Sequence, residues 1–170
     1  MIHSVPNVIV NAAFLKAMKD EHFKLYNMLD NLHAFWLIND PTIFNPEWFR
    51  VLVSEFRDLL ELHFELEETY GYVQHRQNHD PDICRESCQL FQQHTVLLDK
   101  LNSIARGAAY LSGRRRTKEP YTTLVNRLQE FYREFQRHEQ AEIDLSMRAM
   151  YAEHKRRKLR LAQAGKLQRQ

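Results

Sequence analysis

The sequence predicts an all-α protein, an antiparallel up-down-up-down four-helix bundle, on three observations. Apolar residues recur at helical spacing along four long stretches. The chain holds only 4 Gly and 5 Pro among its 170 residues, so long helices are not interrupted. The connections between the stretches are short, which favours neighbouring helices that run in opposite directions. We also find no apolar run near the ~18 residues that a membrane span needs.

The first two helices are predicted from apolar spacing and from the residues at their ends. The first spans about 11–37. The second begins after Asn45, which can cap a helix, and Pro46 suits the first helical position. It continues to about Tyr70, where Gly71 is a plausible stop. The sequence therefore predicts two long helices joined by a short loop.

The last two helices follow from the same kinds of signal. The third begins with Asp80 as cap and Pro81 in the first position, and it fades over 110–113. The fourth begins near Glu119 and continues past Met150. Each predicted helix is long enough to span a bundle, and we see no domain boundary before residue 154.

The histidines divide the chain into two copies of one pattern. Each copy opens with His-x-x-Leu-x-x-x-Leu, once at His22 and once at His94. A His-x-x-x-Glu pair follows later in each copy. The two pairs are His63 with Glu67 and His138 with Glu142. The pattern indicates an internal repeat in which the first two helices correspond to the last two.

The spacing of these residues points to a metal site. Residues four apart lie on the same face of a helix, and both His-x-x-x-Glu pairs lie among apolar residues. A glutamate on a core face is costly unless it is paired or bound to a cation. Imidazole with carboxylate suits iron, although manganese and zinc are also allowed. The alternative is that each histidine is a packed core residue without a metal, and the repetition of the pattern favours the metal.

The chain resembles the hemerythrin-like, or HHE cation-binding, domains over about 14–152. The matching segments are DEHFKLYNMLDNL, LLELHFELEETYGYV, FQQHTVLLDKL and FQRHEQAEIDL. The resemblance implies a bundle around two non-haem iron ions with an oxo or hydroxo bridge. The ligands that it implies are His22 and His63 for one iron, His94 and His138 for the other, and Glu67 and Glu142 as bridges.

The sequence departs from the oxygen-carrying members of that family in one respect. Those proteins have a second histidine four residues along the third helix, whereas Leu90 and Leu98 flank His94 here. The second iron would then keep an open or water-filled position or take a nearby carboxylate. We therefore expect a protein that binds or senses oxygen or iron, with O2 or a related small oxygen or nitrogen species as its ligand. A di-iron redox enzyme acting on O2, peroxide or nitric oxide and a metal-free structural bundle are the alternatives.

Other metal motifs fit less well. Ferritin-like di-iron proteins use Glu-x-x-His, which none of the four histidines shows. The segment that begins at His138 is similar to the His-Glu-x-x-His of zinc proteases, but Glu142 replaces the second histidine. Tyr26 and Tyr132 could face the site, with packing as the alternative role. We expect His33 to be a packing residue.

The C-terminal segment has its own composition. Residues 155–170 contain seven Lys+Arg and no acid, whereas 1–154 carry 17 Lys+Arg and 22 Asp+Glu, a sum of −5. We predict a bundle over 1–154 and a basic, frayed or disordered tail over 155–170. The alternative is that the tail contacts nucleic acid or another anionic surface. We find no signal peptide at the N-terminus, so we expect a cytoplasmic location.

Overall fold

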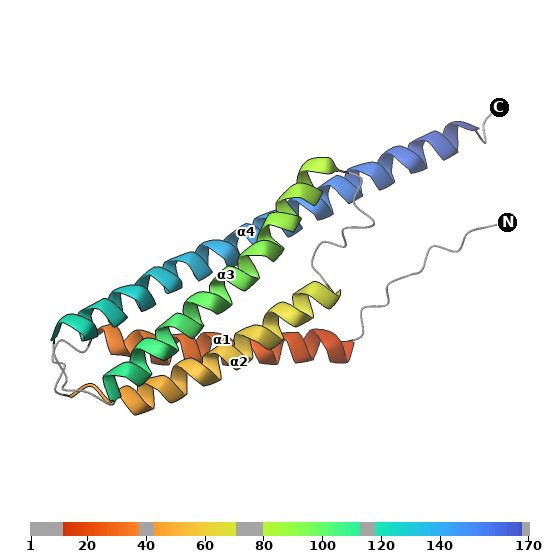
Figure 1. The fold of residues 1–170 in the computed structure, drawn as a ribbon. Coiled ribbons are helices and arrows are strands. Elements are labelled where there is room, and N and C mark those ends of the chain that lie inside the picture. Colours follow the sequence, from red (N-terminus) through yellow and green to blue (C-terminus); the bar gives the residue numbers. More distant parts are fainter. Residues whose placement is uncertain (1–11, 38–42, 71–79, 113–117, 168–170) are drawn as a thin grey trace.

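The structure is a computed structural model, and it forms an all-helical bundle. Its α-helices are α1 (Ala12–Ala34), α2 (Pro46–Tyr70), α3 (Pro81–Ser112) and α4 (Lys118–Leu167), with a 3₁₀ helix, η1 (Phe35–Leu37), after α1 (Figure 1). The described backbone covers 12–37, 43–70, 80–112 and 118–167, and it contains no strand. Within it, the side chains of 12–22, 36, 70, 112, 118–120 and 164–167 are outside the description. The predicted all-α class is confirmed.

Two of the helices begin at the caps that the sequence predicts. The Asn45 side-chain oxygen accepts a hydrogen bond from the Trp48 backbone N–H at 3.0 Å. The Asp80 carboxylate accepts one from the Asp82 backbone N–H, also at 3.0 Å. Each bond gives a partner to a backbone donor that the first turn of a helix otherwise leaves unpaired. The starts of α2 and α3 are therefore fixed by local chemistry.

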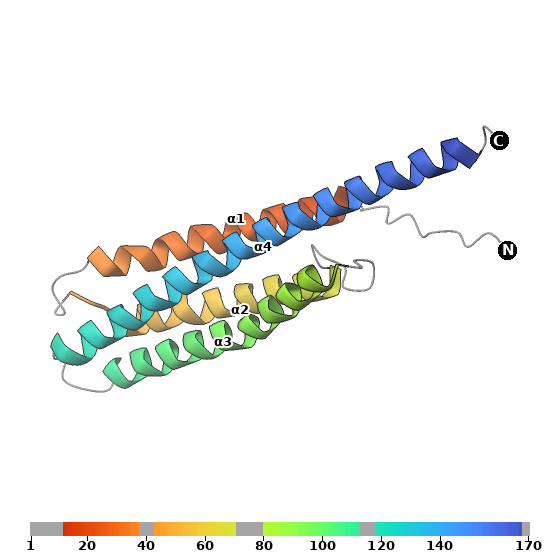
Figure 2. The ribbon, with the colours of Figure 1, turned by 90° about the horizontal axis from the view of Figure 1, so that it is seen from above.

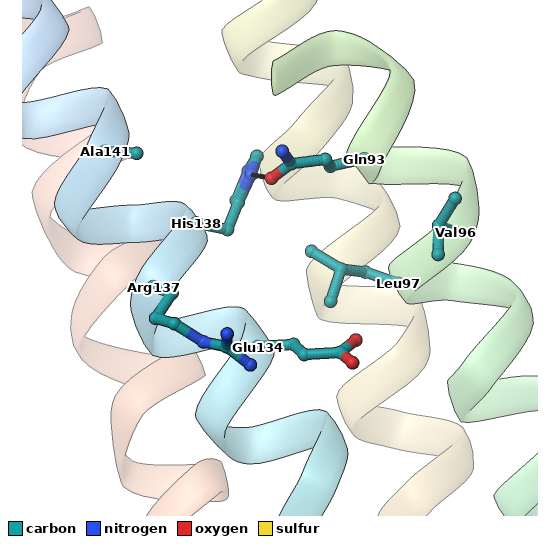
Figure 3. A pocket seen from close by; sticks show the side chains of 7 residues that line it. All are labelled: Gln93, Val96, Leu97, Glu134, Arg137, His138 and Ala141. Carbon is teal, nitrogen blue, oxygen red and sulfur yellow. Dashed lines mark hydrogen bonds between the residues drawn. The ribbon is translucent and has the colours of Figure 1, made fainter. Parts of the chain in front are cut away.

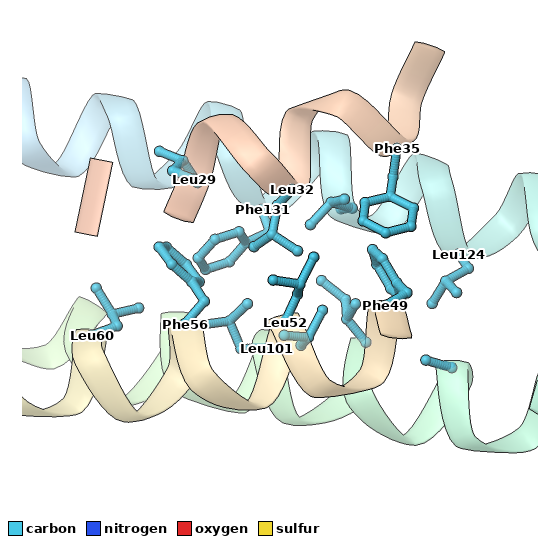
Figure 4. Packing of buried hydrophobic residues seen from close by; sticks show 14 of the residues in the cluster. Leu29, Leu32, Phe35, Phe49, Leu52, Phe56, Leu60, Leu101, Leu124 and Phe131 are labelled. Carbon is cyan, nitrogen blue, oxygen red and sulfur yellow. The ribbon is translucent and has the colours of Figure 1, made fainter. Parts of the chain in front are cut away.

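The core follows a regular spacing along each helix. Most buried positions follow one another at steps of three and four residues, which is the period by which helices pack in a bundle. Figure 4 shows the resulting layers of leucine and phenylalanine, in which the Phe56 and Phe131 rings meet edge to face with centroids 5.9 Å apart. On α3 the buried series is Ile83, Ser87, Leu90, His94, Leu97, Leu101, Ile104, Ala108 and Leu111. The predicted metal-ligating histidine of α3 thus occupies a core position.

An aromatic cluster closes one end of the bundle. The rings of Phe35 and Phe49 lie 4.8 Å apart, and those of Phe44 and Tyr121 lie 4.9 Å apart. The Tyr121 hydroxyl donates a hydrogen bond to the Phe35 carbonyl at 3.3 Å. This cluster joins the segment after α1, the start of α2 and the start of α4. Apolar packing therefore joins these three segments at this end of the bundle, and the polar core residues lie further along the helices.

The helix α4 is much longer than its neighbours. It has 50 residues against 25 in α2, and at 1.5 Å per residue it spans about 75 Å. Figures 1 and 2 show its C-terminal part projecting beyond the other helices. The helix passes through residue 154 without a break, so the prediction of a frayed or disordered tail is wrong over 155–167. Lys, Arg, Leu, Ala and Gln dominate this segment, and all of them favour helix.

No described helix is both long enough and apolar enough to cross a membrane.

Candidate metal centre

Most of the predicted ligands meet inside the bundle. His63, His94 and His138 are each 2% exposed, and Glu67 is 3% exposed. His22 lies on α1, but its side chain is outside the description, so its assignment as a ligand stays a prediction. The helices that supply the others are α2 for His63 and Glu67, α3 for His94, and α4 for His138 and Glu142.

One group of donors lies between α2, α3 and α4. One ligand atom from each of Glu67, His94, His138 and Glu142 lies within 4.8 Å of the others. His94 Nε2 is 3.5 Å from Glu142 Oε1 and 3.7 Å from Glu67 Oε2. His138 Nε2 is 3.4 Å from the same Glu142 oxygen. The four side chains therefore present their donor atoms to a single small volume.

Several of these donor atoms have no hydrogen bond within the described structure. They are His94 Nε2, His138 Nε2, Glu67 Oε2 and Glu142 Oε2, and all four are inaccessible to solvent. A buried polar atom without a partner costs about 1–3 kcal/mol. Imidazole nitrogens and carboxylate oxygens are the donors that iron, manganese and zinc accept. The donor set therefore fits a metal, which would supply a partner to every one of these atoms.

Hydrogen bonds on the outer side of the imidazoles fix their orientation. His94 Nδ1 lies 2.9 Å from Glu68 Oε1, and His138 Nδ1 lies 3.1 Å from Gln93 Oε1. A carboxylate only accepts, so a neutral His94 carries its proton on Nδ1 and turns the Nε2 lone pair toward the group. Outer partners of this kind hold metal-ligating histidines in place. Figure 3 shows the bond between Gln93 and His138.

A second group contains a glutamate that the sequence did not single out. His63 Nε2 is 3.1 Å from Glu67 Oε1 and 3.2 Å from Glu139 Oε1, and these three residues form a second cluster of possible ligands. Glu139 is only 7% exposed. Glu67 belongs to both groups, so the two clusters are continuous. The extra carboxylate, that of Glu139, thus lies beside His63. It does not lie beside His94, where a carboxylate could have replaced the missing fifth histidine.

The sequence did contain a signal for Glu139. It follows Phe135 by four residues and precedes Glu142 by three, so it continues the core-facing stripe of α4. The His-x-x-x-Glu spacing drew attention to Glu142 alone. At the place of the fifth histidine, Leu90 is buried and Leu98 packs against the core, so neither position offers a ligand.

The two tyrosines have different environments. The Tyr26 hydroxyl donates to Glu139 Oε2 at 3.4 Å, and its ring lies 6.5 Å from that of Phe135. Burial and the neighbouring Glu139 raise the pKa of Tyr26 to about 12, so the phenol keeps its proton. Tyr132 instead stacks on His33 at 5.9 Å. Tyr26 is therefore at the edge of the centre, whereas His33 is exposed and its ring contacts Tyr132 away from the centre.

The carboxylates of the centre titrate differently. Burial raises the pKa of Glu67 to about 7, against the hydrogen bond and charge of His63. Burial also acts to raise the pKa of Glu142, but the nearby His94 and His138 outweigh it and lower that pKa. Burial lowers the pKa of His138. A neutral His138 and an ionised Glu142 are the forms that bind a metal.

No protein-family model matches this chain, and neither the curated proteins nor the solved structures contain a significant match to it. The relation to hemerythrin-like domains is therefore a resemblance of motifs, and the functional argument depends on the geometry of the centre.

Proposed function

We propose that this protein is a hemerythrin-like metal-binding protein whose antiparallel bundle holds a pair of non-haem iron ions and that binds or senses oxygen or iron. One observation carries the proposal. Four buried donor atoms from α2, α3 and α4 converge on one volume without a hydrogen bond among the described residues. A cytoplasmic location stays the prediction made from the sequence.

The two clusters suggest how a metal pair would be held. Glu67 is shared by both clusters, as a bridging carboxylate would be. His94, His138 and Glu142 would hold one ion, and His63 with Glu139 would hold the other, together with His22 as the sequence predicts. When bound, such a pair supplies electrons to oxygen or to a related small molecule. The protein supplies a largely buried site, fixed imidazole orientations, and a proton on Tyr26 that is directed at Glu139.

A second candidate function is a di-iron redox enzyme acting on O2, peroxide or nitric oxide. The observation that favours it is the number of carboxylates, because Glu139 adds a third glutamate to the centre. Carboxylates are harder ligands than imidazoles and stabilise the higher oxidation state of iron. A centre of this composition is less suited to simple reversible oxygen carriage than one with five histidines.

The first test is metal content after anaerobic reconstitution with ferrous iron, read together with the ultraviolet–visible spectrum. We expect about two irons per chain in the wild type, and a loss of at least half in His63→Ala and in Glu67→Ala, because each removes a buried ligand. His33→Ala is the matched control and should keep its iron, since His33 stacks on Tyr132 outside the centre.

Two outcomes contradict the proposal. A wild-type protein that takes up no iron would leave the metal-free structural bundle as the better interpretation. Full iron content in both ligand variants would show that these residues do not bind it. With iron present, a reversible optical response to O2 supports the binder, and steady consumption of O2 or peroxide with a reductant supports the enzyme.

A further inference from the structure

The last part of α4 extends beyond the bundle. Ala149 and Ala152 still pack against a buried cluster that includes Ile83 of α3, and Arg148 forms an ion pair with Glu86 of α3 at the same level. Beyond this level α4 projects past the start of α3 (Figures 1 and 2). We call residues 155–167 the basic extension. It is a helix that the bundle holds at one end only.

Positive charge lies on every side of the basic extension. Five of the six residues over 155–160 are basic, and successive residues of a helix are about 100° apart around its axis. Arg156 is half-buried and lies 3.4 Å from Glu153, the last acidic residue of the chain. The other four are exposed and form no ion pair with a described residue. They are Lys155, Arg157, Lys158 and Arg160. Like charges this close repel one another, so a polyanion would stabilise them.

The basic extension has no apolar face. Leu159 and Leu161 are 56% and 65% exposed, and because they are two positions apart they lie about 160° apart around the helix. A helix that lies on a membrane, or that pairs with a second copy of itself, needs an apolar stripe along one side. A second copy would also bring the same charges together. The side-chain pattern therefore argues against a lipid surface and against a coiled coil.

A groove bordered by anions on both sides matches this charge distribution. The major groove of double-stranded DNA is about 12 Å wide, and a helix with its side chains is about 10–12 Å in diameter. Phosphates line both edges of that groove, so cations on opposite sides of one helix can each reach a phosphate. An acidic protein surface would contact one side only. The major groove of an RNA duplex is too deep and narrow to admit a helix.

We propose that the basic extension binds in the major groove of double-stranded DNA, where its lysines and arginines contact phosphates without reading the base sequence. The inference goes beyond the proposed function and does not depend on it, because Glu142 of the centre and Lys155 lie about 20 Å apart along α4. Residues 1–154 sum to −5, so the extension is the part of the chain that a polyanion would meet. The bundle itself would stay outside the groove.

The first test is the affinity of the full-length protein for a short labelled DNA duplex, measured by fluorescence anisotropy over a range of salt concentrations. If four or five cations contact phosphates, the logarithm of the association constant should fall against the logarithm of the salt concentration with a slope of about −4. Replacement of the four exposed basic residues by glutamine, which also favours helix, should weaken binding at least tenfold at low salt and flatten the slope by about 3–4. The changes are Lys155→Gln, Arg157→Gln, Lys158→Gln and Arg160→Gln.

A second quadruple variant is the matched control. It removes the same charge from exposed positions on the bundle, through Lys24→Gln, Arg106→Gln, Arg127→Gln and Arg133→Gln. This variant should bind the duplex within about twofold of the wild type and keep the salt slope, because none of its changes lies in the extension. An equal loss of affinity in both quadruple variants would mean that net charge alone governs binding, and it would overturn the proposal. So would a wild type that does not bind the duplex.

The fit to a groove has its own variant. Leu159→Pro keeps every charge but breaks the helix within the basic extension, and circular dichroism checks that helix is lost. Binding should weaken at least fivefold, because the cations no longer stand around one axis. Unchanged affinity would mean that the segment acts as a flexible basic arm, and the groove assignment would fail.

Competition distinguishes DNA from the other polyanions. At equal phosphate concentration, an RNA duplex of the same sequence and vesicles of phosphatidylserine should each displace the labelled DNA less well than unlabelled DNA does. If either competitor displaces it equally well, the assignment to the DNA major groove is overturned. None of these measurements requires iron, so a failure of the metal centre and a failure of this inference are seen separately.

Discussion

Glu67 is the residue on which the two halves of the candidate centre depend. Its side chain is nearly inaccessible to solvent, lies 3.1 Å from His63 through one oxygen, and directs the other toward His94. Burial raises its pKa to about 7. Without a metal, the folded protein therefore favours the protonated carboxyl below about pH 7. A bound cation would reverse this preference, because positive charge favours the carboxylate.

The raised pKa of Glu67 makes the stability of the metal-free protein depend on pH. A carboxyl whose pKa is raised by folding contributes stability below its unfolded pKa of about 4.3, and that contribution is lost as the pH rises toward the folded pKa of about 7. We expect the free energy of unfolding of the wild type to fall between pH 5 and 7.5 by on the order of 3 kcal/mol relative to Glu67→Gln. Urea denaturation with a chelator measures it, and parallel pH profiles would contradict it.

Within a helix, the candidate metal ligands and the core leucines lie on the same buried face. On α3, His94 lies between Leu90 and Leu97 at steps of four and three residues, and Leu101 and Ile104 continue the series. The apolar part of each stripe holds the helices together, and the polar part forms the centre. A substitution in the apolar part should therefore reduce stability without removing a ligand.

Leu101→Ala tests this separation. Leu101 is 0% exposed, so the change should lower the free energy of unfolding by about 2–5 kcal/mol, while iron per folded chain stays at the wild-type value. Val96→Ala, on the same helix at a side chain 53% exposed, should change stability by less than about 0.5 kcal/mol. Denaturation and metal analysis of both variants check the prediction. A Leu101→Ala protein that is folded but free of iron would count against it.

The elements differ in how far the sequence predicts them. The starts of α2 and α3 depend on Asn45 and Asp80, whose hydrogen bonds lie within the next three residues, so local sequence was enough. The contact of Glu139 with His63 joins positions 76 apart in the chain. The spacing of residues within α4 does not show which residue of α2 the Glu139 side chain contacts. The end of α4 was missed for a different reason, because basic charge suggested disorder where helix propensity prevailed.

For the whole molecule, a metal pair would be part of the folded structure. A ligand that binds only the native state adds about 4 kcal/mol at a thousand times its Kd. In a chain of this size each kcal/mol shifts the Tm by roughly 2–4 °C. If the centre holds metal, its buried donor atoms without hydrogen-bond partners would make the metal-free state the less stable one.

Removal of the metal should therefore lower the thermal stability of the whole protein. We expect chelation of the iron-loaded wild type to lower the Tm by on the order of 10 °C. The double variant His63→Ala, Glu67→Ala should show no such shift, since it lacks the buried ligands. Differential scanning calorimetry with and without chelator measures the effect. An equal shift in the double variant would mean that the metal acts elsewhere on the chain.

The length of α4 has an electrical consequence. The segment 155–170 carries seven basic residues and no acidic one, and the rest of the chain sums to −5. Because α4 continues without a break to Leu167, it carries the basic residues before that point away from the acidic part of the chain. The molecule is therefore a strong permanent dipole, with its positive pole at the free end of the helix. In the field of a negatively charged surface it turns so that this pole approaches first, and the candidate centre stays on the side away from that surface.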